Sequence, residues 1–476
     1  MYQQISSILQ DFILDFKRFR TWQWFVAMVI GFMIRGSHNG VTSMISSLRL
    51  KPKLYPSAIH FFRSNGYETD DLYTKWIQTA KKECELQRIG GRILLIGDHI
   101  KKSKEGRRMP DIELLHQSSE NSGKNKYIEG HNYGHVSAVI TNGKISRSLP
   151  LITELQKSPP KDKKTKKPIG DTVVVQIAKL VKKTAVAIDE PVLAAVDGYF
   201  CNGPSFKAIE EAQTKNGEQL IWMVTRGRRN TVGFKTPEPP NVKKPGRPKV
   251  YGEKVVLKDI FSNTSEFKQA TMMIYGKKTK VKYLCLDLLW RPLKKMVRFV
   301  LVESDLGKMI LLSNSLTLDP EDCIAAYVLR YKIEPSFDEQ KNDIGSFSYR
   351  FWSKSQPKRT KWQKNNDKPD DLDNKNVVLA KKATEAFVCV ATIASGILSA
   401  LAFSHSNEIW KRYPGWLRTI RSNIPTIATV KDTLAQDFHS VLKHHSTYLV
   451  GFNFLGQWIR KEDFVYEVLD ELEEAS

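Results

Sequence analysis

Two short stretches decide the fold of this chain: residues 92–98 read RILLIGD and residues 192–197 read VLAAVD. Each is an apolar run with the length of a buried β-strand, and each ends on an aspartate. We expect the two runs to be neighbouring strands, with Asp98 and Asp197 at the strand ends, where side chains leave the core and enter a cleft. These two carboxylates are therefore the first candidates for a functional site.

The segments around these runs alternate between strand and helix patterns. Strand candidates cover residues 127–129, 136–141 and 220–224, and helix patterns cover 172–183 and 205–215. A basic, proline-interrupted loop, Lys157–Lys167, precedes the first of these helices. Three strands, a helix and then a strand is the order of an RNase H-like sheet, so the sequence predicts an α/β fold with an RNase H-like mixed sheet core.

The chain divides into five expected regions. They are a helical N-terminal domain (1–88), the first part of the core (89–225), a β-rich insertion (226–316), the second part of the core (317–405) and a helical C-terminal region (406–476). The insertion is predicted from β-rich runs at 283–290, 297–302 and 309–312. The expected architecture is thus a core sheet with an inserted β subdomain, flanked by helical N- and C-terminal domains.

Two segments have patterns typical of DNA contacts. Residues 22–34, a break at 36–40 and residues 41–50 read as helix, turn, helix, although ordinary helix packing produces the same pattern. Arg247, between Gly246 and Pro248 in a basic, proline-rich stretch, has the form of a minor-groove hook, with a solvated linker as the alternative.

The composition favours a polyanionic partner. The chain has 74 Lys and Arg against 51 Asp and Glu, a net charge of +23, which favours nucleic acid over anionic lipid or a merely basic protein. The five cysteines form no C-x-x-C pair, which indicates a reducing, cytoplasmic location, and the first residues lack a basic signal-peptide start. Residues 386–404 carry no charge; we expect a buried core helix, with a membrane span as the alternative.

Cleavage of phosphodiesters with Mg²⁺ or Mn²⁺ requires about three carboxylates around one or two ions. Asp98 and Asp197 supply two, and Glu334 is the best candidate for the third because of its neighbours. Tyr327, Arg330, Glu334 and Lys341 lie at offsets of three, seven and fourteen residues, which at about 100° per residue places them in one helical stripe. A solvated helix face is the alternative explanation.

The Tyr-x-x-Arg-x-x-x-Glu-x-x-x-x-x-x-Lys spacing resembles the signature of a family of bacterial insertion-sequence transposases, named YREK after these four residues. Residues 104–110 (KEGRRMP) and 127–134 (YIEGHNYG), which follow Asp98, resemble the same group. The resemblance covers roughly residues 20–460.

The resemblance implies a DDE-type transposase that cuts and joins double-stranded DNA as a homodimer, by a cut-and-paste route. A hairpin at the excised end and another cleavage route both stay open. On this interpretation residues 1–88 bind DNA, residues 89–225 and 317–405 form the catalytic core, and residues 406–476 serve dimerisation or DNA-end contacts. Asp98, Asp197 and Glu334 would bind two Mg²⁺ or Mn²⁺ ions, while Tyr327, Arg330 and Lys341 would hold phosphates. The family also has a β insertion between the second aspartate and the glutamate. Pro335 departs from a regular helix, because proline disfavours an α conformation in the residue before it. We therefore expect a kink or a restart there, which affects Lys341 more than Arg330.

Trp290 lies beside Arg291, Lys294 and Lys295, and an indole flanked by cations can stack on an extruded base. Packing of Trp290 in the core of the insertion is the alternative. The expected function is metal-dependent DNA cleavage and strand transfer at the ends of a mobile element. Two alternatives stay open: a catalytically inactive, transposase-derived DNA-binding protein, and a nuclease of the RNase H fold.

Overall fold

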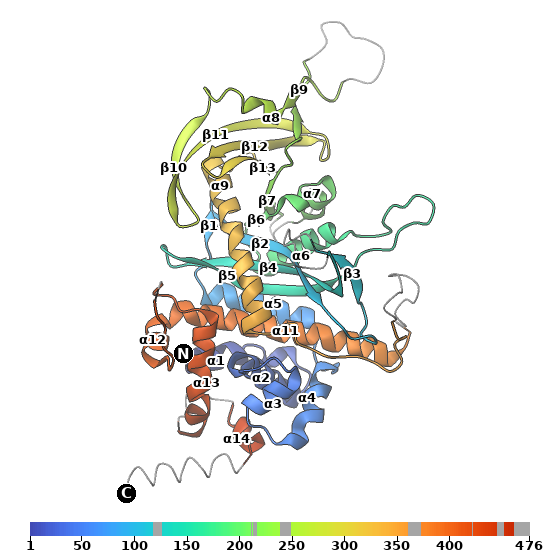
Figure 1. The fold of residues 1–476 in the computed structure, drawn as a ribbon, viewed down its shortest axis with the longest axis vertical. Coiled ribbons are helices and arrows are strands. Elements are labelled where there is room, and N and C mark those ends of the chain that lie inside the picture. Colours follow the sequence, from blue (N-terminus) through green and yellow to red (C-terminus); the bar gives the residue numbers. More distant parts are fainter. Residues whose placement is uncertain are drawn as a thin grey trace.

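The two apolar runs form adjacent parallel strands in the middle of a large sheet (Figure 1). The computed structural model describes residues 1–117, 126–210, 212, 217–238, 249–359, 373–420, 422–444 and 452–460. Strand β2 (Arg92–Ser103) pairs with β6 (Val192–Val196) from Ile93 opposite Val192 to Gly97 opposite Val196. All five residues of β6 are buried, as a strand covered on both faces requires. The predicted α/β class is confirmed.

The strands in the described parts of the chain join into one mixed sheet of thirteen, in the order β3-β4-β2-β6-β7-β13-β12-β11-β8-β9, with β1 on β2, β5 on β4 and β10 on β11. Pairing is antiparallel among β5, β4 and β2 and parallel among β2, β6 and β7. The other strands are β1 (Arg88–Ile89), β3 (Glu113–His116), β4 (Tyr127–Thr141), β5 (Ser146–Gln156), β7 (Ile221–Arg226), β8 (Val232–Phe234), β9 (Lys254–Val256), β10 (Lys268–Ile274), β11 (Lys277–Trp290), β12 (Lys295–Ser304) and β13 (Gly307–Ser313).

Helices cover both faces of the sheet centre. On one face, α6 (Val173–Ile188) packs in the core cluster that contains Ile93 and Leu95, and α7 (Gly203–Glu210) lies beside it. On the other, α9 (Pro320–Leu329) packs in the cluster that contains Leu94 and Ile96. Alternate residues of β2 thus face different helices, as a strand's two-residue period requires.

The β-rich insertion extends the central sheet. Residues Leu311–Ser313 of β13 pair with Val224–Arg226 of β7, so the insertion strands continue the core sheet (upper part of Figure 1). This pairing covers the edge of β7, which would otherwise present unpaired backbone groups. The expected inserted subdomain is therefore joined to the core by backbone hydrogen bonds, and the short helix α8 (Leu257–Ile260) lies within it.

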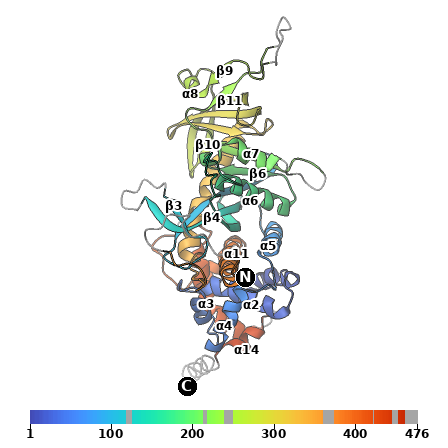
Figure 2. The ribbon, with the colours of Figure 1, turned by 90° about the vertical axis from the view of Figure 1, so that its right-hand side faces the viewer.

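The N-terminal and C-terminal helices form one layer at the other end of the molecule (Figures 1 and 2). The N-terminal ones are α1 (Tyr2–Gln10), α2 (Phe19–Ile34), α3 (Val41–Ser47), α4 (Tyr55–Phe62) and α5 (Thr69–Glu83), and the C-terminal ones are α11 (Lys375–Ser404), α12 (Ser406–Arg412), α13 (Ile427–His444) and α14 (Phe454–Trp458). The α-amino group of Met1 lies 3.2 Å from the Glu408 carboxylate, which joins the start of the chain to α12.

Helix α2 is a core helix. Every residue from Trp22 to Ile34 is buried, and α2 packs against α11 and α13. Helix α3 buries Val41, Met44 and Ile45. Residues 22–50 therefore pack as ordinary core helices, which was the alternative to a DNA-binding helix-turn-helix.

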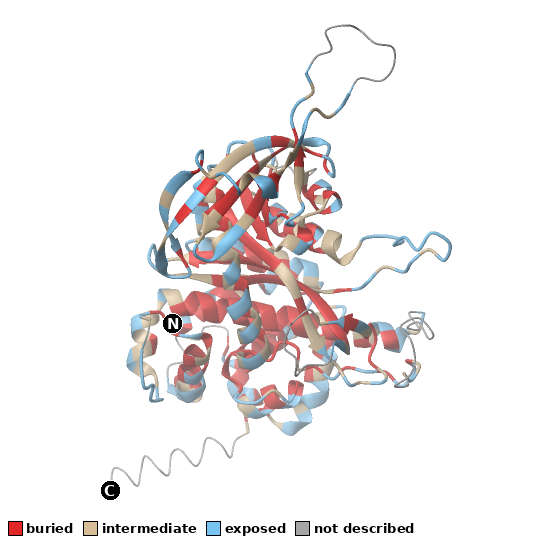
Figure 3. Cartoon of the chain, turned by 45° about the horizontal axis from the view of Figure 1, so that its top comes forward, coloured by how far each residue is buried: buried red, intermediate tan, exposed pale blue. Residues whose placement is uncertain are grey.

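Helix α11 is long and apolar enough to cross a membrane, and 94% of its apolar window is buried inside the protein. It lies against β5, α2 and α5, and Figure 3 shows buried residues concentrated along it and in the sheet. Gly396 allows Trp76 to approach, since a Cβ at Gly396 would lie 2.2 Å from the indole, whose Nε1 donates to Pro150 O at 2.8 Å. This packing agrees with the core-helix expectation.

Candidate active site

The pairing between β2 and β6 ends at Gly97 and Val196, and Asp98 and Asp197 are the next residues on the two strands. The expectation that both aspartates end their strands is correct for Asp197 and wrong for Asp98. Strand β2 runs on to Ser103 because its other edge stays paired with β4, where Asp98 lies opposite His135. Asp98 therefore lies at a step in the sheet, where one neighbouring strand has ended and the other continues.

The third carboxylate comes from the segment that follows α9. The expected single helix is a succession of three pieces: a 3-10 turn (Arg330–Lys332), α10 (Ile333–Asp338) and a π turn (Glu339–Asp343). Pro335 falls in the first turn of α10, where its missing N–H costs no intrahelical hydrogen bond. The expected restart near Pro335 is observed, two residues before it.

The side chains of Asp98, Asp197, Tyr327 and Arg330 form one connected cluster with Glu334. The Arg330 guanidinium lies 3.7 Å from the Asp98 carboxylate and 3.4 Å from the Glu334 carboxylate. The Tyr327 hydroxyl donates to Asp197 Oδ1 at 3.4 Å. Arg330 also lies over the Tyr327 ring, 5.7 Å from its centroid. The structure therefore brings Asp98, Asp197, Tyr327, Arg330 and Glu334 together.

The cluster perturbs its own ionisation. Burial, with smaller effects of Asp197 and Glu334, raises the pKa of Asp98 to about 6, although the His99 N–H and Arg330 oppose this rise. Burial also raises the pKa of Tyr327 to about 12, assisted by Asp197. Burial opposes the charge on Arg330, yet its neighbours Tyr327, Asp197, Asp98 and Glu334 raise its pKa above the usual value. Arg330 is therefore a permanent cation, and Tyr327 is a protonated donor.

The described residues contain no group of three His, Cys, Asp or Glu side chains already gathered as a metal site. In the cluster, Asp98 and Glu334 contact the Arg330 cation. The donor chemistry still fits Mg²⁺ or Mn²⁺, because three carboxylates supply the hard oxygen ligands that these ions prefer. The Arg330 Nε is buried and makes no hydrogen bond to the described residues, so this guanidinium retains an unused donor.

Two residues that the sequence did not indicate position the aspartates. Thr225 Oγ1 donates to the Asp197 carbonyl at 2.8 Å. The His99 ring stacks on Phe200 with centroids 5.4 Å apart, and the Phe200 N–H donates to the Asp197 carbonyl at 3.0 Å. His99 thus connects β2 to the turn after Asp197. Its position next to Asp98 was the available signal, but a stack between distant residues has no sequence pattern.

The other predicted DNA-contact residues lie elsewhere. Lys341 is half-buried in the π turn, seven residues after Glu334. Trp290 is 6% exposed and packs edge-on against Phe206, with ring centroids 5.6 Å apart. This arrangement agrees with the alternative that Trp290 packs in a core and does not stack on a base. Arg291 is exposed and lies 4.4 Å from the Phe234 centroid. Arg247 lies outside the described residues.

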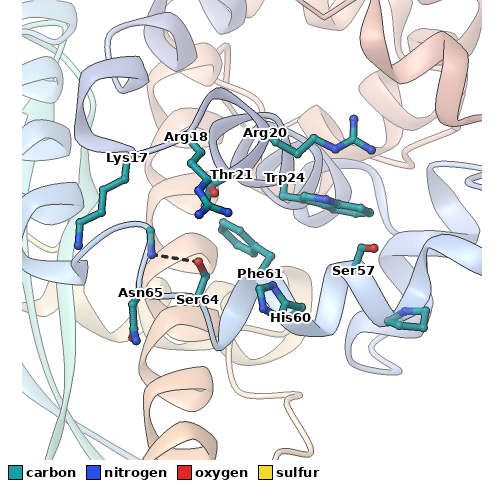
Figure 4. Close-up of a pocket in the computed structure, with 12 residues that line it drawn as sticks. Lys17, Arg18, Arg20, Thr21, Trp24, Ser57, His60, Phe61, Ser64 and Asn65 are labelled. Atoms are coloured by element: carbon teal, nitrogen blue, oxygen red, sulfur yellow. Dashed lines mark hydrogen bonds between the residues drawn. The ribbon is translucent and has the colours of Figure 1, made fainter.

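A separate pocket of about 740 Å³ lies in the N-terminal helices, between the start of α2 and α4 (Figure 4). Lys17, Arg18, Arg20 and His60 line it together with the ring of Phe61. No residue of the carboxylate cluster lines this pocket. Its basic lining is compatible with the DNA-binding role expected for residues 1–88.

A comparison with models of known protein families finds no match for this chain, and no curated protein matches its sequence. The cluster and the spacing of its residues along the chain are therefore the features that bear on function.

Proposed function

We propose that this protein is a DDE-type DNA transposase, which binds the terminal inverted repeats of its own mobile element and catalyses metal-dependent strand cleavage and strand transfer. The observation that carries the proposal is the cluster in which Asp98, Asp197 and Glu334 meet Arg330 and Tyr327. A solvated helix face would not direct Tyr327 and Arg330 to two aspartates that are far away in the sequence.

The strand order supports an RNase H-like core. The order β5-β4-β2-β6-β7, antiparallel in its first three strands and parallel in its last three, with α6 connecting β5 to β6, is the arrangement expected of that fold. The net charge of +23 supports a nucleic-acid partner. By the resemblance, the active complex is a cytoplasmic homodimer that bridges two DNA ends.

Asp98, Asp197 and Glu334 would hold Mg²⁺ or Mn²⁺, two ions by the resemblance. When bound, the metal supplies Lewis-acid activation of the attacking water or hydroxyl and stabilises the leaving oxygen. Arg330 offers a planar fork of N–H donors that fits a phosphate, and Tyr327 offers one O–H donor beside Asp197. Both side chains are thereby suited to holding the scissile phosphate next to the carboxylates.

Two other functions remain as alternatives. A transposase-derived DNA-binding protein without catalysis would not need three carboxylates in one cluster. A simple nuclease of the same fold would need neither the insertion strands nor the large helical layer.

The test is Mg²⁺-dependent nicking of a duplex that carries an end of the element and its flank, with the full chain. Asp98→Ala, Asp197→Ala and Glu334→Ala should each abolish nicking and retain DNA binding, because affinity comes mainly from Lys and Arg contacts to phosphate. Asp338→Ala is the matched control, since Asp338 is an exposed carboxylate one turn after Glu334; it should cut at the wild-type rate. Nicking retained by all three variants would reject the proposed function.

A further inference from the structure

Residues 157–172 project from the body as an arm between β5 and α6 (Figures 1 and 3). The arm is an ordered hairpin: Lys161 and Pro168 form an antiparallel bridge, and the Ile169 N–H donates to Pro160 O at 2.7 Å. At the tip, Asp162 Oδ1 accepts hydrogen bonds from the N–H groups of Lys164 at 3.0 Å and Thr165 at 2.6 Å. Asp162 therefore fixes the turn that presents the lysines around it.

The arm carries an excess of unpaired positive charge. Residues 157–172 contain six lysines and two aspartates. Lys157 pairs with Asp111 at 3.0 Å, and Asp171 pairs with Lys179. The remaining five lysines are exposed, and none has an ion-pair partner among the described residues: Lys161, Lys163, Lys164, Lys166 and Lys167. Mutual repulsion between these like charges opposes the folded state, so the lysine cluster does not contribute to stability.

The basic surface continues at the base of the arm. A hollow of about 620 Å³ lies between the arm, α6 and α7, and Lys179, Lys182 and Lys207 line it together with Gly170 and Thr172. Lys182 and Lys207 have no ion-pair partner in the described part of the chain. The arm and the hollow thus form one continuous basic surface.

This surface starts at the same edge of the sheet as the carboxylates. Strands β5, β2 and β6 run in the same direction, because β4 is antiparallel to both β5 and β2 and β2 is parallel to β6. Gln156 ends β5 and Val173 begins α6, so these two residues are the feet of the arm. His99 Nε2 lies 2.8 Å from Gln156 Oε1 and 3.2 Å from Val173 O. The ring next to Asp98 therefore contacts both feet.

We propose that the arm, together with Lys179, Lys182 and Lys207, binds the phosphate backbone of the same DNA duplex that is cut at the carboxylates. This inference rests on the proposed function and adds a contact surface to it. The eight residues from Lys157 to Lys164 extend at most about 27 Å, most of one helical turn of about 34 Å. The arm can therefore follow the duplex past the cutting site.

The test measures how the affinity of the full chain for a 30-base-pair duplex of mixed sequence depends on salt. The arm variant combines Lys163→Gln, Lys164→Gln, Lys166→Gln and Lys167→Gln. Each lost phosphate contact lowers the slope of log affinity against log salt by about 0.9. We expect the slope to fall by about 2 to 4 and the affinity at 0.1 M salt to fall at least tenfold.

The matched control combines Lys277→Gln, Lys278→Gln, Lys280→Gln and Lys282→Gln in the β10–β11 hairpin. These four lysines are also exposed, so the control removes the same charge from another surface. Its slope should stay within about 1 of the wild-type value. A second variant, Lys182→Gln with Lys207→Gln, tests the hollow and should lower the slope by about 1 to 2.

A wild-type slope in both test variants, or an equal loss in the control, would overturn the inference. The proposed function would survive that result as long as the wild-type protein binds and nicks the duplex. A wild-type protein that does not bind duplex DNA would reject the proposed function itself, so the two failures are distinguishable.

Discussion

The Arg330 guanidinium lies 3.7 Å from the Asp98 carboxylate, and this contact joins the turn that follows α9 to strand β2 in the middle of the sheet. The same guanidinium lies 3.4 Å from Glu334. In the absence of metal, Arg330 thus neutralises two of the three carboxylates that would hold the ions. Under the proposed function, engagement of a phosphate by Arg330 would therefore release the carboxylates to metal.

Replacing Arg330 with alanine should have opposite effects on metal binding and on catalysis. Without the guanidinium, Mn²⁺ should bind the DNA-free protein at least as tightly as it binds the wild type. Single-turnover cleavage and strand transfer at saturating metal should fall about 10- to 100-fold, because a hydrogen bond to a charged group contributes about 1.5–3 kcal/mol. Calorimetric Mn²⁺ titration measures the effect on metal binding, and assays on pre-nicked ends measure the effect on catalysis. Wild-type cleavage rates would show that Arg330 holds no phosphate.

Tyr327→Phe removes only the hydroxyl that donates to Asp197. We expect cleavage to fall about 10- to 100-fold, since a hydrogen bond to a charged group contributes about 1.5–3 kcal/mol. Tyr331→Phe is the control, because Tyr331 is 43% exposed in the turn that follows α9 and contacts Tyr275 through its ring. Equal rates for the two variants would remove the Tyr327 hydroxyl from the site.

Asp98 makes the metal-free protein sensitive to pH. Its folded pKa of about 6 is higher than the ordinary 3.8, so its contribution to stability is present below about pH 4 and is lost as the pH rises through 6. Between pH 4 and 7, wild type should lose about 1–3 kcal/mol of unfolding free energy relative to Asp98→Asn. Urea unfolding in a chelator measures this difference, and a difference that does not change with pH would contradict the assigned burial of Asp98.

Variants of Trp290 distinguish a role in core packing from a role in base stacking. Because the ring is buried against Phe206, Trp290→Ala should lower the unfolding free energy by about 3–5 kcal/mol, and Trp290→Phe should cost less. Nicking and the later steps of the proposed reaction should then fall together. If stability is unchanged while only the later steps slow, Trp290 stacks on an extruded base.

Gly396→Ala should destabilise the contact between α11 and α5 by about 1–3 kcal/mol, because the added methyl group would overlap the Trp76 ring. Gly36→Ala is the control, since a Cβ at Gly36 would meet no atom within 4 Å. Thermal unfolding compares the two variants. A similar midpoint for both would mean that α11 does not pack on Trp76 as described.

The sequence by itself determined the central strands and the order of the signature residues. The apolar runs before Asp98 and Asp197 are long and regular enough to specify two buried strands, and the structure has these strands as β2 and β6. The spacing of Tyr327, Arg330 and Glu334 likewise directs these side chains to one side of a helical segment. Both features depend on local periodicity, which the sequence records directly.

Only the tertiary structure decided the features that depend on distant partners. Strand β2 continues past Asp98 because β4 pairs with it, and the insertion joins the core because β13 pairs with β7. The ring of His99 meets Phe200, Gln156 and Val173 for the same reason: three separate segments come together at one sheet edge. The physical reason is that local conformation is fixed by neighbouring residues, whereas the choice of pairing partner depends on long-range burial and backbone hydrogen bonding, which leave no periodic pattern in the sequence.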